Sequence, residues 1–132
     1  MTLVRFEDLD VWKRSARLSA ELYKMLSGLR DFGFREQITR SGLSIPSNVA
    51  EGMERRSMKE KRRFLDIALG SCAELRTQPY IGVEIGYIDK EVGKAWIAET
   101  REISAMLVGL RNSYTSHRHK LTFLEYLEFQ SE

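Results

Sequence analysis

Apolar side chains recur along most of this chain at the spacing of an α-helix. Between Val11 and Leu29 they lie alternately four and three residues apart, and three later segments show comparable spacing. This repeat places apolar residues on one face of a helix, whereas a half-buried strand requires strict alternation, which no segment shows. The pattern therefore predicts four amphipathic helices, each with one face to bury. The first stripe comprises Val11, Ser15, Leu18, Leu22, Met25 and Leu29, widened by Trp12, Ser19, Tyr23 and Leu26.

Turn signals and a proline set the expected limits of the first two helices. The first helix begins after Phe6, and a glycine-bounded turn at residues 28–33 follows it. The second helix runs from about Phe34 to Glu54 and contains Pro46. An interior proline removes one hydrogen bond and crowds the preceding turn. We therefore expect a kink or a restart at this proline, with Ser44 as the cap of a restarted helix.

The third helix has a recognisable N-terminal signal. Ser57 and Glu60 have the spacing of a capping box, in which the serine hydroxyl accepts from the Glu60 N–H and the carboxylate reaches back. This helix is expected to extend to about Tyr87 and to bend at Pro79. Its core-facing stripe comprises Phe64, Ala68, Ser71, Leu75, Gln78, Gly82 and Ile85.

The connections between the predicted helices determine how they pack. Asp89 is the expected cap of a fourth helix that ends at about Arg111. Short connections require that successive helices run antiparallel to one another. The prediction is an all-α fold, an antiparallel up-down-up-down four-helix bundle over residues 1–112, with a short C-terminal extension at 113–132. Within this extension, residues 121–129 are a candidate short helix, and 132 residues in total fit one domain.

Several features favour the cytoplasm as the location of this chain. No segment reaches the run of about 20 apolar residues that spans a bilayer, so no membrane association is expected. The N-terminus lacks the basic and apolar regions of a signal peptide. Cys72 is the only cysteine and has no disulfide partner within the chain, which favours a reducing compartment. We expect Cys72 to be a small buried hydrophobic residue.

Motifs for catalysis and metal binding are missing from the sequence. There is no H-E-x-x-H, no glycine-rich phosphate loop and no cysteine pair. The Glu51/Glu54 and Glu99/Glu102 pairs have helical spacing but lack the histidine that bundle di-iron sites require. His117 and His119 supply only two ligands on a polar segment. The sequence predicts no enzyme, no cofactor, no metal site and no small-molecule substrate.

Charge is distributed unevenly along the chain. Residues 1–63 carry fourteen Lys and Arg against nine Asp and Glu, whereas residues 64–132 carry seven against ten. A short basic run lies at the end of the first half and makes one part of the molecule locally positive. Such a run suits the phosphates of RNA or DNA, whereas the simpler interpretation is a solvated surface that supplies solubility. The candidate nucleic-acid-binding residues are Arg55, Arg56, Lys59, Lys61, Arg62 and Arg63; four of them, Arg55, Lys59, Arg62 and Arg63, share one helical sector if helix geometry covers the run.

Two further groups of residues are candidates for contacts between helices or subunits. Residues 44–52 contain a proline and small side chains, which indicate either a partner surface or, as we favour, a device that sets a helix crossing angle. Asn48 and Glu51 in this segment are candidates for hydrogen bonds across a helix pair or a subunit boundary. Tyr80 and Tyr87 lie seven residues apart on one predicted helix face and are candidates for a subunit contact, although aromatic residues are more often in the core.

Four stretches of the chain resemble the four-helix bundle family encoded in intervening sequences of 23S ribosomal RNA genes. The stretches, within a match of roughly residues 5–112, are F-E-D-L-D-V-W from Phe6, S-I-P-S-N-V-A-E-G from Ser44, F-L-D-I-A-L-G-S from Phe64, and G-Y-I from Gly86. The resemblance implies a bundle that assembles into a homopentameric ring. A similar protein accompanies the reverse transcriptase of diversity-generating retroelements as a basic nucleic-acid-binding factor. The last twenty residues match nothing in the family pattern.

The sequence and the resemblance together give two functional hypotheses. The first is a non-enzymatic, oligomeric helical bundle that serves as an RNA- or DNA-binding accessory factor through its basic run. The alternative is a protein–protein interaction scaffold, in which the basic run serves assembly or binds an acidic protein partner.

Overall fold

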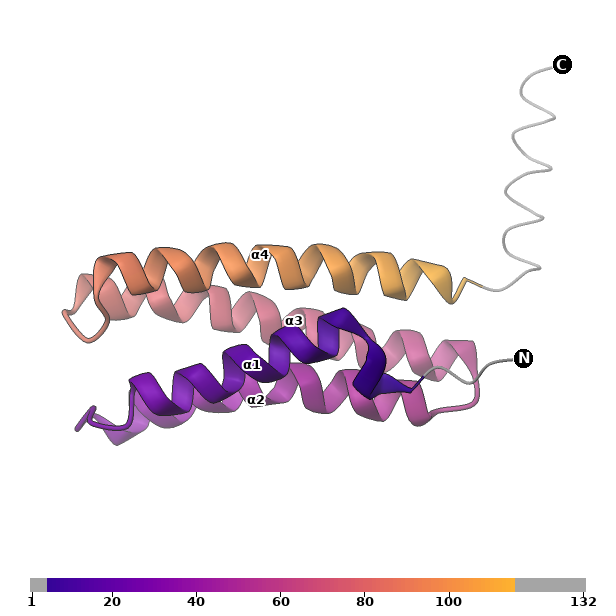
Figure 1. The fold of residues 1–132 in the computed structure, drawn as a ribbon, viewed down its shortest axis with the longest axis horizontal. Helices are drawn as coiled ribbons and strands as arrows, with labels where there is room; N and C mark the ends of the chain where they lie inside the picture. Colours follow the sequence, from indigo (N-terminus) through magenta and orange to yellow (C-terminus); the bar gives the residue numbers. More distant parts are fainter. Residues whose placement is uncertain (1–4, 116–132) are drawn as a thin grey trace, which may run out of the picture.

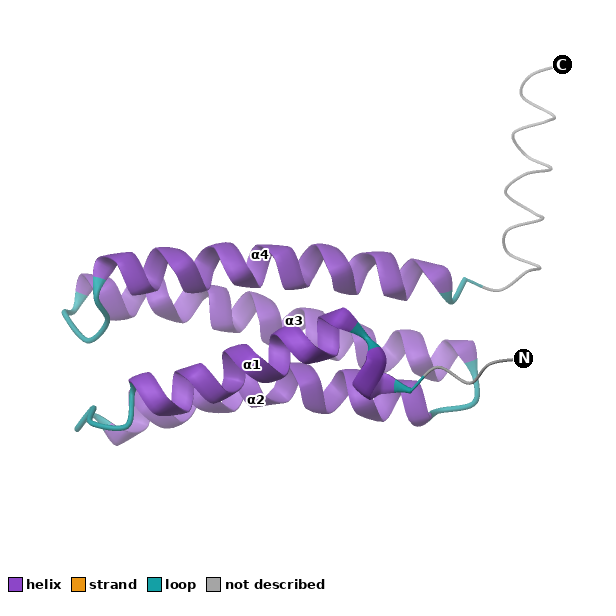
Figure 2. Ribbon diagram, in the orientation of Figure 1, coloured by secondary structure: helices purple, strands orange, loops and turns teal. Residues whose placement is uncertain are grey.

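The computed structural model describes residues 5–115 and contains four long α-helices within them (Figure 1). A short 3₁₀ turn, η1 (Phe6–Asp8), precedes α1 (Asp10–Met25), and α2 (Phe32–Glu54), α3 (Met58–Glu84) and α4 (Lys90–Ser113) follow. The described part consists of helices and connecting loops, without a strand (Figure 2). Each helix packs against the next along the chain, and α1 also contacts α4. The predicted all-α, up-down-up-down four-helix bundle is confirmed.

The ends of the helices follow local capping chemistry. The Ser57 hydroxyl accepts from the Glu60 N–H at 3.0 Å, and an Asp89 oxygen accepts from the Glu91 N–H at 3.1 Å. Both predicted caps are therefore present. The cap of α2 is Asp31, which the sequence analysis missed because it placed the start of this helix two residues too late. The Glu60 carboxylate does not complete the capping box, since it pairs with Arg63 instead.

The prolines do not interrupt their helices. α2 continues through Pro46 and α3 continues through Pro79. The restart predicted at Ser44 is wrong, because this residue lies inside α2 and its hydroxyl contacts that of Ser71 on α3 at 2.8 Å. Pro46 is buried. Packing of α2 between α1 and α3 keeps the helix continuous despite the missing hydrogen bond.

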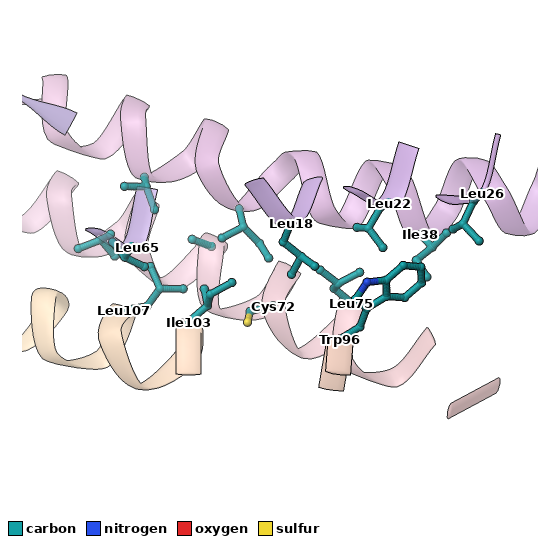
Figure 3. Packing of buried hydrophobic residues seen from close by; sticks show 14 of the residues in the cluster. Leu18, Leu22, Leu26, Ile38, Leu65, Cys72, Leu75, Trp96, Ile103 and Leu107 are labelled. Atoms are coloured by element: carbon teal, nitrogen blue, oxygen red, sulfur yellow. The ribbon is translucent and has the colours of Figure 1, made fainter. Parts of the chain in front are cut away.

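The core runs along the axis of the bundle, and all four helices contribute to it (Figure 3). Leu22, Leu75 and Ile103 are fully buried. Gly42 lets α1 approach α2 closely, because a Cβ at this position would overlap the Leu22 side chain. The core residues labelled in Figure 3 are Leu18, Leu22, Leu26, Ile38, Leu65, Cys72, Leu75, Trp96, Ile103 and Leu107.

Several side chains depart from the predicted stripes. Met25 and Ile85 are about half exposed, at 52% and 50%, whereas Leu26 beside Met25 is buried in the core. Tyr23 is also exposed, since it faces away from the core. Cys72 is fully buried, as predicted. Burial raises the pKa of its thiol, which lies 3.1 Å from the Thr100 carbonyl.

Candidate nucleic-acid interface

The basic run lies at the connection between α2 and α3, at the end of the bundle where α4 finishes (Figure 1). α2 ends at Glu54 and α3 begins at Met58, so Arg55 and Arg56 belong to the connecting turn. Helix geometry therefore covers only part of the run, and the condition under which four of the cations would share one helical sector is not met. We call the six cations of this region the cationic turn: Arg55, Arg56, Lys59, Lys61, Arg62 and Arg63.

Two members of the cationic turn point inward and connect helices. The Lys61 Nζ donates to the Met53 carbonyl on α2 at 3.0 Å and lies 5.5 Å from the centre of the Tyr114 ring. The Arg62 guanidinium donates to the Tyr114 carbonyl at the end of α4. Both side chains are partly buried. They brace the end of the bundle, which leaves them poorly placed to meet an external ligand.

Arg55 and Arg63 remain on the surface, and internal contacts hold both in place. Their guanidinium carbons lie 4.9 Å and 4.5 Å from the centre of the Phe64 ring. Arg55 also pairs with Glu51 at 2.8 Å, and Arg63 pairs with Glu60 at 2.6 Å. The hydrogen bond from Arg63 lowers the pKa of Glu60. Exposed pairs of this kind are weak because water screens them, so phosphate oxygens can replace the carboxylates.

Arg56 and Lys59 complete the outer surface of the cationic turn. Both are exposed, and within residues 5–115 neither makes a hydrogen bond or an ion pair. Four of the six cations therefore face outward. Acidic residues offset part of this charge, since residues 51–66 contain six basic and four acidic side chains. The positive potential is local to the turn and does not extend over the whole end of the bundle.

Comparison with known proteins places the chain among its relatives. The family model of the 23S rRNA-intervening sequence protein matches residues 7–109. The chain belongs to this family. A crystal structure of a protein of unknown function from the S23 ribosomal protein family of Bacteroides thetaiotaomicron VPI-5482 has a TM-score of 0.72 to this chain. The two sequences are 23% identical, and the alignment covers 76% of this chain and 97% of the other.

That structural likeness supports the four-helix fold, and the neighbour's own function is unknown. No curated protein matches this chain significantly. The family match includes the cationic turn and nearly all of α4, and it ends before residues 110–132. In this member of the 23S rRNA-intervening sequence protein family, none of the helices in the described part has the length and apolar composition to cross a membrane.

Asn48 and Glu51 form their hydrogen bonds with residues four positions away in the sequence. The Asn48 Nδ2 donates to the backbone carbonyl and the hydroxyl of Ser44, at 2.8 Å and 2.9 Å. Glu51 pairs with the arginine one turn later, as described above. The hydrogen bonds between α2 and α3 are made by other polar side chains, of which the sequence pattern placed only Gln78 on the core-facing stripe. Ser41 accepts from Gln78 at 3.1 Å and donates to Glu74 at 2.9 Å.

Tyr80 and Tyr87 do not share a helix face. Tyr80 lies on α3 and accepts a long hydrogen bond of 3.4 Å from Arg101 on α4. Tyr87 follows the end of α3 and donates to the Asp31 carboxylate at 2.9 Å. The predicted extent of this helix to Tyr87 is wrong, because α3 ends at Glu84. A subunit contact through the two tyrosines stays a prediction. Both side chains are nevertheless exposed.

Asp31 joins the two loops at the end of the bundle opposite the cationic turn (Figure 1). One carboxylate oxygen accepts from the Phe34 N–H at 3.0 Å, and the other accepts from the Tyr87 hydroxyl. The Phe34 N–H and then the Tyr87 hydroxyl lower the pKa of Asp31 below its ordinary value of 3.8. The same carboxylate raises the pKa of Tyr87 above its ordinary value of 10.0.

This carboxylate makes the stability of the protein sensitive to acid. Because the folded state lowers the pKa of Asp31, its stabilisation is complete above the ordinary pKa of 3.8 and is lost as the pH falls through the lower folded value. We expect the melting temperature to fall less between about pH 5 and about pH 2 in Asp31→Asn than in the wild type. Thermal unfolding followed by circular dichroism measures this difference. An identical fall in both proteins contradicts the prediction.

Within residues 5–115 there is no cluster of three or more His, Cys, Asp or Glu side chains that could hold a metal ion. His117 and His119 lie outside the described residues. Glu99, one of the paired glutamates considered above, instead forms an ion pair with Arg14 that joins α1 to α4. Its two oxygens accept from the guanidinium at 2.5 Å and 3.1 Å.

Proposed function

We propose that this chain is a non-enzymatic binding protein that contacts the backbone of RNA or DNA through the outer face of the cationic turn. The main support for the proposal is that the six cations of the turn fall into two groups, one that contacts other helices and one that faces solvent. Lys61 and Arg62 brace α2, α3 and the end of α4, while the other four cations face outward on that brace. A rigid, outward-facing group of cations matches the repeated negative charge of a phosphate backbone.

The chemistry of these side chains favours the backbone over base sequence. Arginine forms paired hydrogen bonds with phosphate oxygens, and Lys59 adds a compact charge. Arg55 and Arg63 are already held over Phe64, so little side-chain freedom is lost on binding. The cations lie on a turn and the first turns of α3, and within residues 5–115 every long helix packs in the bundle, so none is free to enter a groove. Binding is therefore expected to vary little with sequence.

The dependence of affinity on salt tests this proposal. In a plot of log affinity against log salt concentration, four phosphate contacts give a slope of about −3.6 for duplex DNA and about −2.8 for single strands, whereas six would give about −5.4 for the duplex. Fluorescence anisotropy with labelled single- and double-stranded RNA and DNA measures this slope. No binding to any of the four at low salt, or binding that does not change with salt, overturns the proposal.

A second proposal concerns association between copies of the chain through the outer face of α3. Ile81 and Ile85 lie one turn apart and are 48% and 50% exposed. Ile67, which is also exposed, lies about four turns earlier on the same side. Two isoleucines one turn apart that both remain half exposed favour burial against another protein surface. Light scattering of the pure protein tests the proposal, and a single-chain mass at all concentrations contradicts it.

The two proposals reinforce each other. One copy with four phosphate contacts binds weakly at physiological salt, whereas several linked copies gain affinity through effective concentration. The homopentameric ring that the resemblance implies would present the cationic turn five times. If copies associate but bind no nucleic acid, the protein is a scaffold and the cationic turn serves an acidic partner.

A further inference from the structure

Two arginines meet at the seam between α3 and α4, which lie side by side along the bundle (Figure 1). The Arg76 Nε on α3 donates to the Thr100 hydroxyl on α4 at 3.3 Å. The Arg101 Nη2 on α4 donates to the Tyr80 hydroxyl on α3 at 3.4 Å. Thr100 and Arg101 are consecutive, and Tyr80 follows Arg76 by about one helical turn of 5.4 Å. Both guanidinium groups therefore reach the same short stretch of the seam.

The acidic residues closest to these arginines in the sequence make contacts elsewhere. On α3, Glu74 accepts from a serine of α2 at 2.9 Å. On α4, Glu99 pairs with an arginine of α1, and together with Glu102 it raises the pKa of that arginine. Among the described residues, neither Arg76 nor Arg101 makes an ion pair. The seam is therefore locally positive.

Hydrogen-bond donors at the seam remain without acceptors. Arg76 is partly buried, and a guanidinium group withdrawn from water needs acceptors for its N–H groups. The groups beside it, the Thr100 hydroxyl and the Cys72 thiol, are uncharged. Within residues 5–115 its two terminal nitrogens donate to no oxygen atom. The Tyr80 hydroxyl accepts from Arg101, so its own hydrogen is also available to a ligand.

We propose that Arg76, Arg101 and Tyr80 bind a phosphate group at the seam between α3 and α4. A phosphate monoester carries a charge of about −1.5 to −2 at pH 7 and has three acceptor oxygens, which match two guanidinium groups and a hydroxyl. A carboxylate has only one charge and two oxygens. Arg76 lies about 20 Å along α3 from Arg63, so the cationic turn takes no part. This proposal and the nucleic-acid proposal therefore fail separately.

Titration of the full chain with inorganic phosphate at constant ionic strength tests the site. The backbone amide signals of Thr100 and Tyr80 in NMR spectra report on the seam rather than on the cationic turn. We expect saturable shifts of both signals with a Kd of about 1 mM or lower. Acetate should bind at least about tenfold more weakly, because it carries less charge. No saturation by about 20 mM phosphate, or equal affinities for the two anions, overturns the proposal.

Substitution of both arginines tests which residues hold the anion. Arg76→Gln with Arg101→Gln is expected to weaken phosphate binding at least about tenfold, since each arginine supplies charge-assisted hydrogen bonds. The matched control, Arg17→Gln with Arg30→Gln, replaces two exposed arginines elsewhere and also changes the net charge from +2 to 0. Its affinity should stay within about twofold of the wild type. Equal losses in the two double variants overturn the proposal.

A single variant keeps the test valid if the loss of Arg76 disturbs the fold, which circular dichroism detects. Arg101 is exposed, so Arg101→Gln should leave the bundle intact. It is expected to weaken phosphate binding by about threefold or more. An unchanged affinity in this folded variant overturns the assignment.

The phosphate group can belong to a free phosphate compound or to the end of a nucleic-acid strand. A single-stranded oligonucleotide with a terminal phosphate is therefore compared with the same strand ending in a hydroxyl. If only the phosphorylated strand shifts the Thr100 and Tyr80 signals, the site holds the end of a strand. If inorganic phosphate binds and neither strand does, the site takes a free phosphate compound. Equal shifts with both strands overturn the proposal, because a singly charged diester is then sufficient.

Discussion

Replacing the four outward-facing cations of the cationic turn with glutamine is expected to lower the affinity for RNA or DNA about a thousandfold at about 0.15 M salt. Four phosphate contacts give a log–log slope of about −3.6, and this salt concentration lies about 0.8 logarithmic units below 1 M, so the ionic contribution is about three orders of magnitude. Lys61 and Arg62 are kept because they brace the bundle. The variant combines Arg55→Gln, Arg56→Gln, Lys59→Gln and Arg63→Gln.

A control variant tests whether the loss of affinity depends on where the cations lie or only on the change in net charge. It replaces four exposed cations at the opposite end of the bundle, so both variants change the net charge from +2 to −2. The control combines Lys24→Gln, Arg30→Gln, Lys90→Gln and Lys94→Gln. Its affinity should stay within about tenfold of the wild type, since only the long-range field changes. Equal losses in the two variants would show that total charge matters and the turn does not.

The bundle could be predicted because the information for it is local. A helical repeat requires only residues three and four positions apart, and the caps at Ser57 and Asp89 accept from N–H groups three and two residues later. The errors arose where packing overrides a local preference. Pro46 favours a break when α2 is considered alone, but its burial between neighbouring helices keeps the helix continuous.

The candidate site was harder to predict than the fold. Its composition is visible in the sequence, but the direction of each side chain depends on residues far away in the chain. Arg62 donates to Tyr114, 52 residues later, and this contact removes it from the binding surface. Arg63, its neighbour, stays outside because Phe64 and Glu60 lie beside it. No spacing rule separates these two arginines. The proposed phosphate site was missed for the same reason, since its two arginines lie on different helices.

Charged substitutions on the outer face of α3 are expected to dissociate the proposed oligomer. Because both side chains are already about half buried in the single chain, Ile81→Glu and Ile85→Glu together remove about 1.5–3 kcal/mol of burial on association, before the cost of desolvating two carboxylates is counted. The dissociation constant should therefore rise at least about 10- to 10²-fold. Both side chains are half exposed in the single chain, so the fold should be retained. Circular dichroism tests this retention.

The matched control places the same two charges on a different helix. Ala105→Glu and Val108→Glu are both exposed on α4 and produce an equal change in net charge. Multi-angle light scattering across a dilution series should give the 15.3 kDa mass of one chain for the α3 variant, and the wild-type mass for the control. Dissociation in both variants would indicate general charge repulsion. An α3 variant that keeps the wild-type mass would show that the copies associate through another surface, because two unpaired carboxylates cannot remain buried in a stable contact.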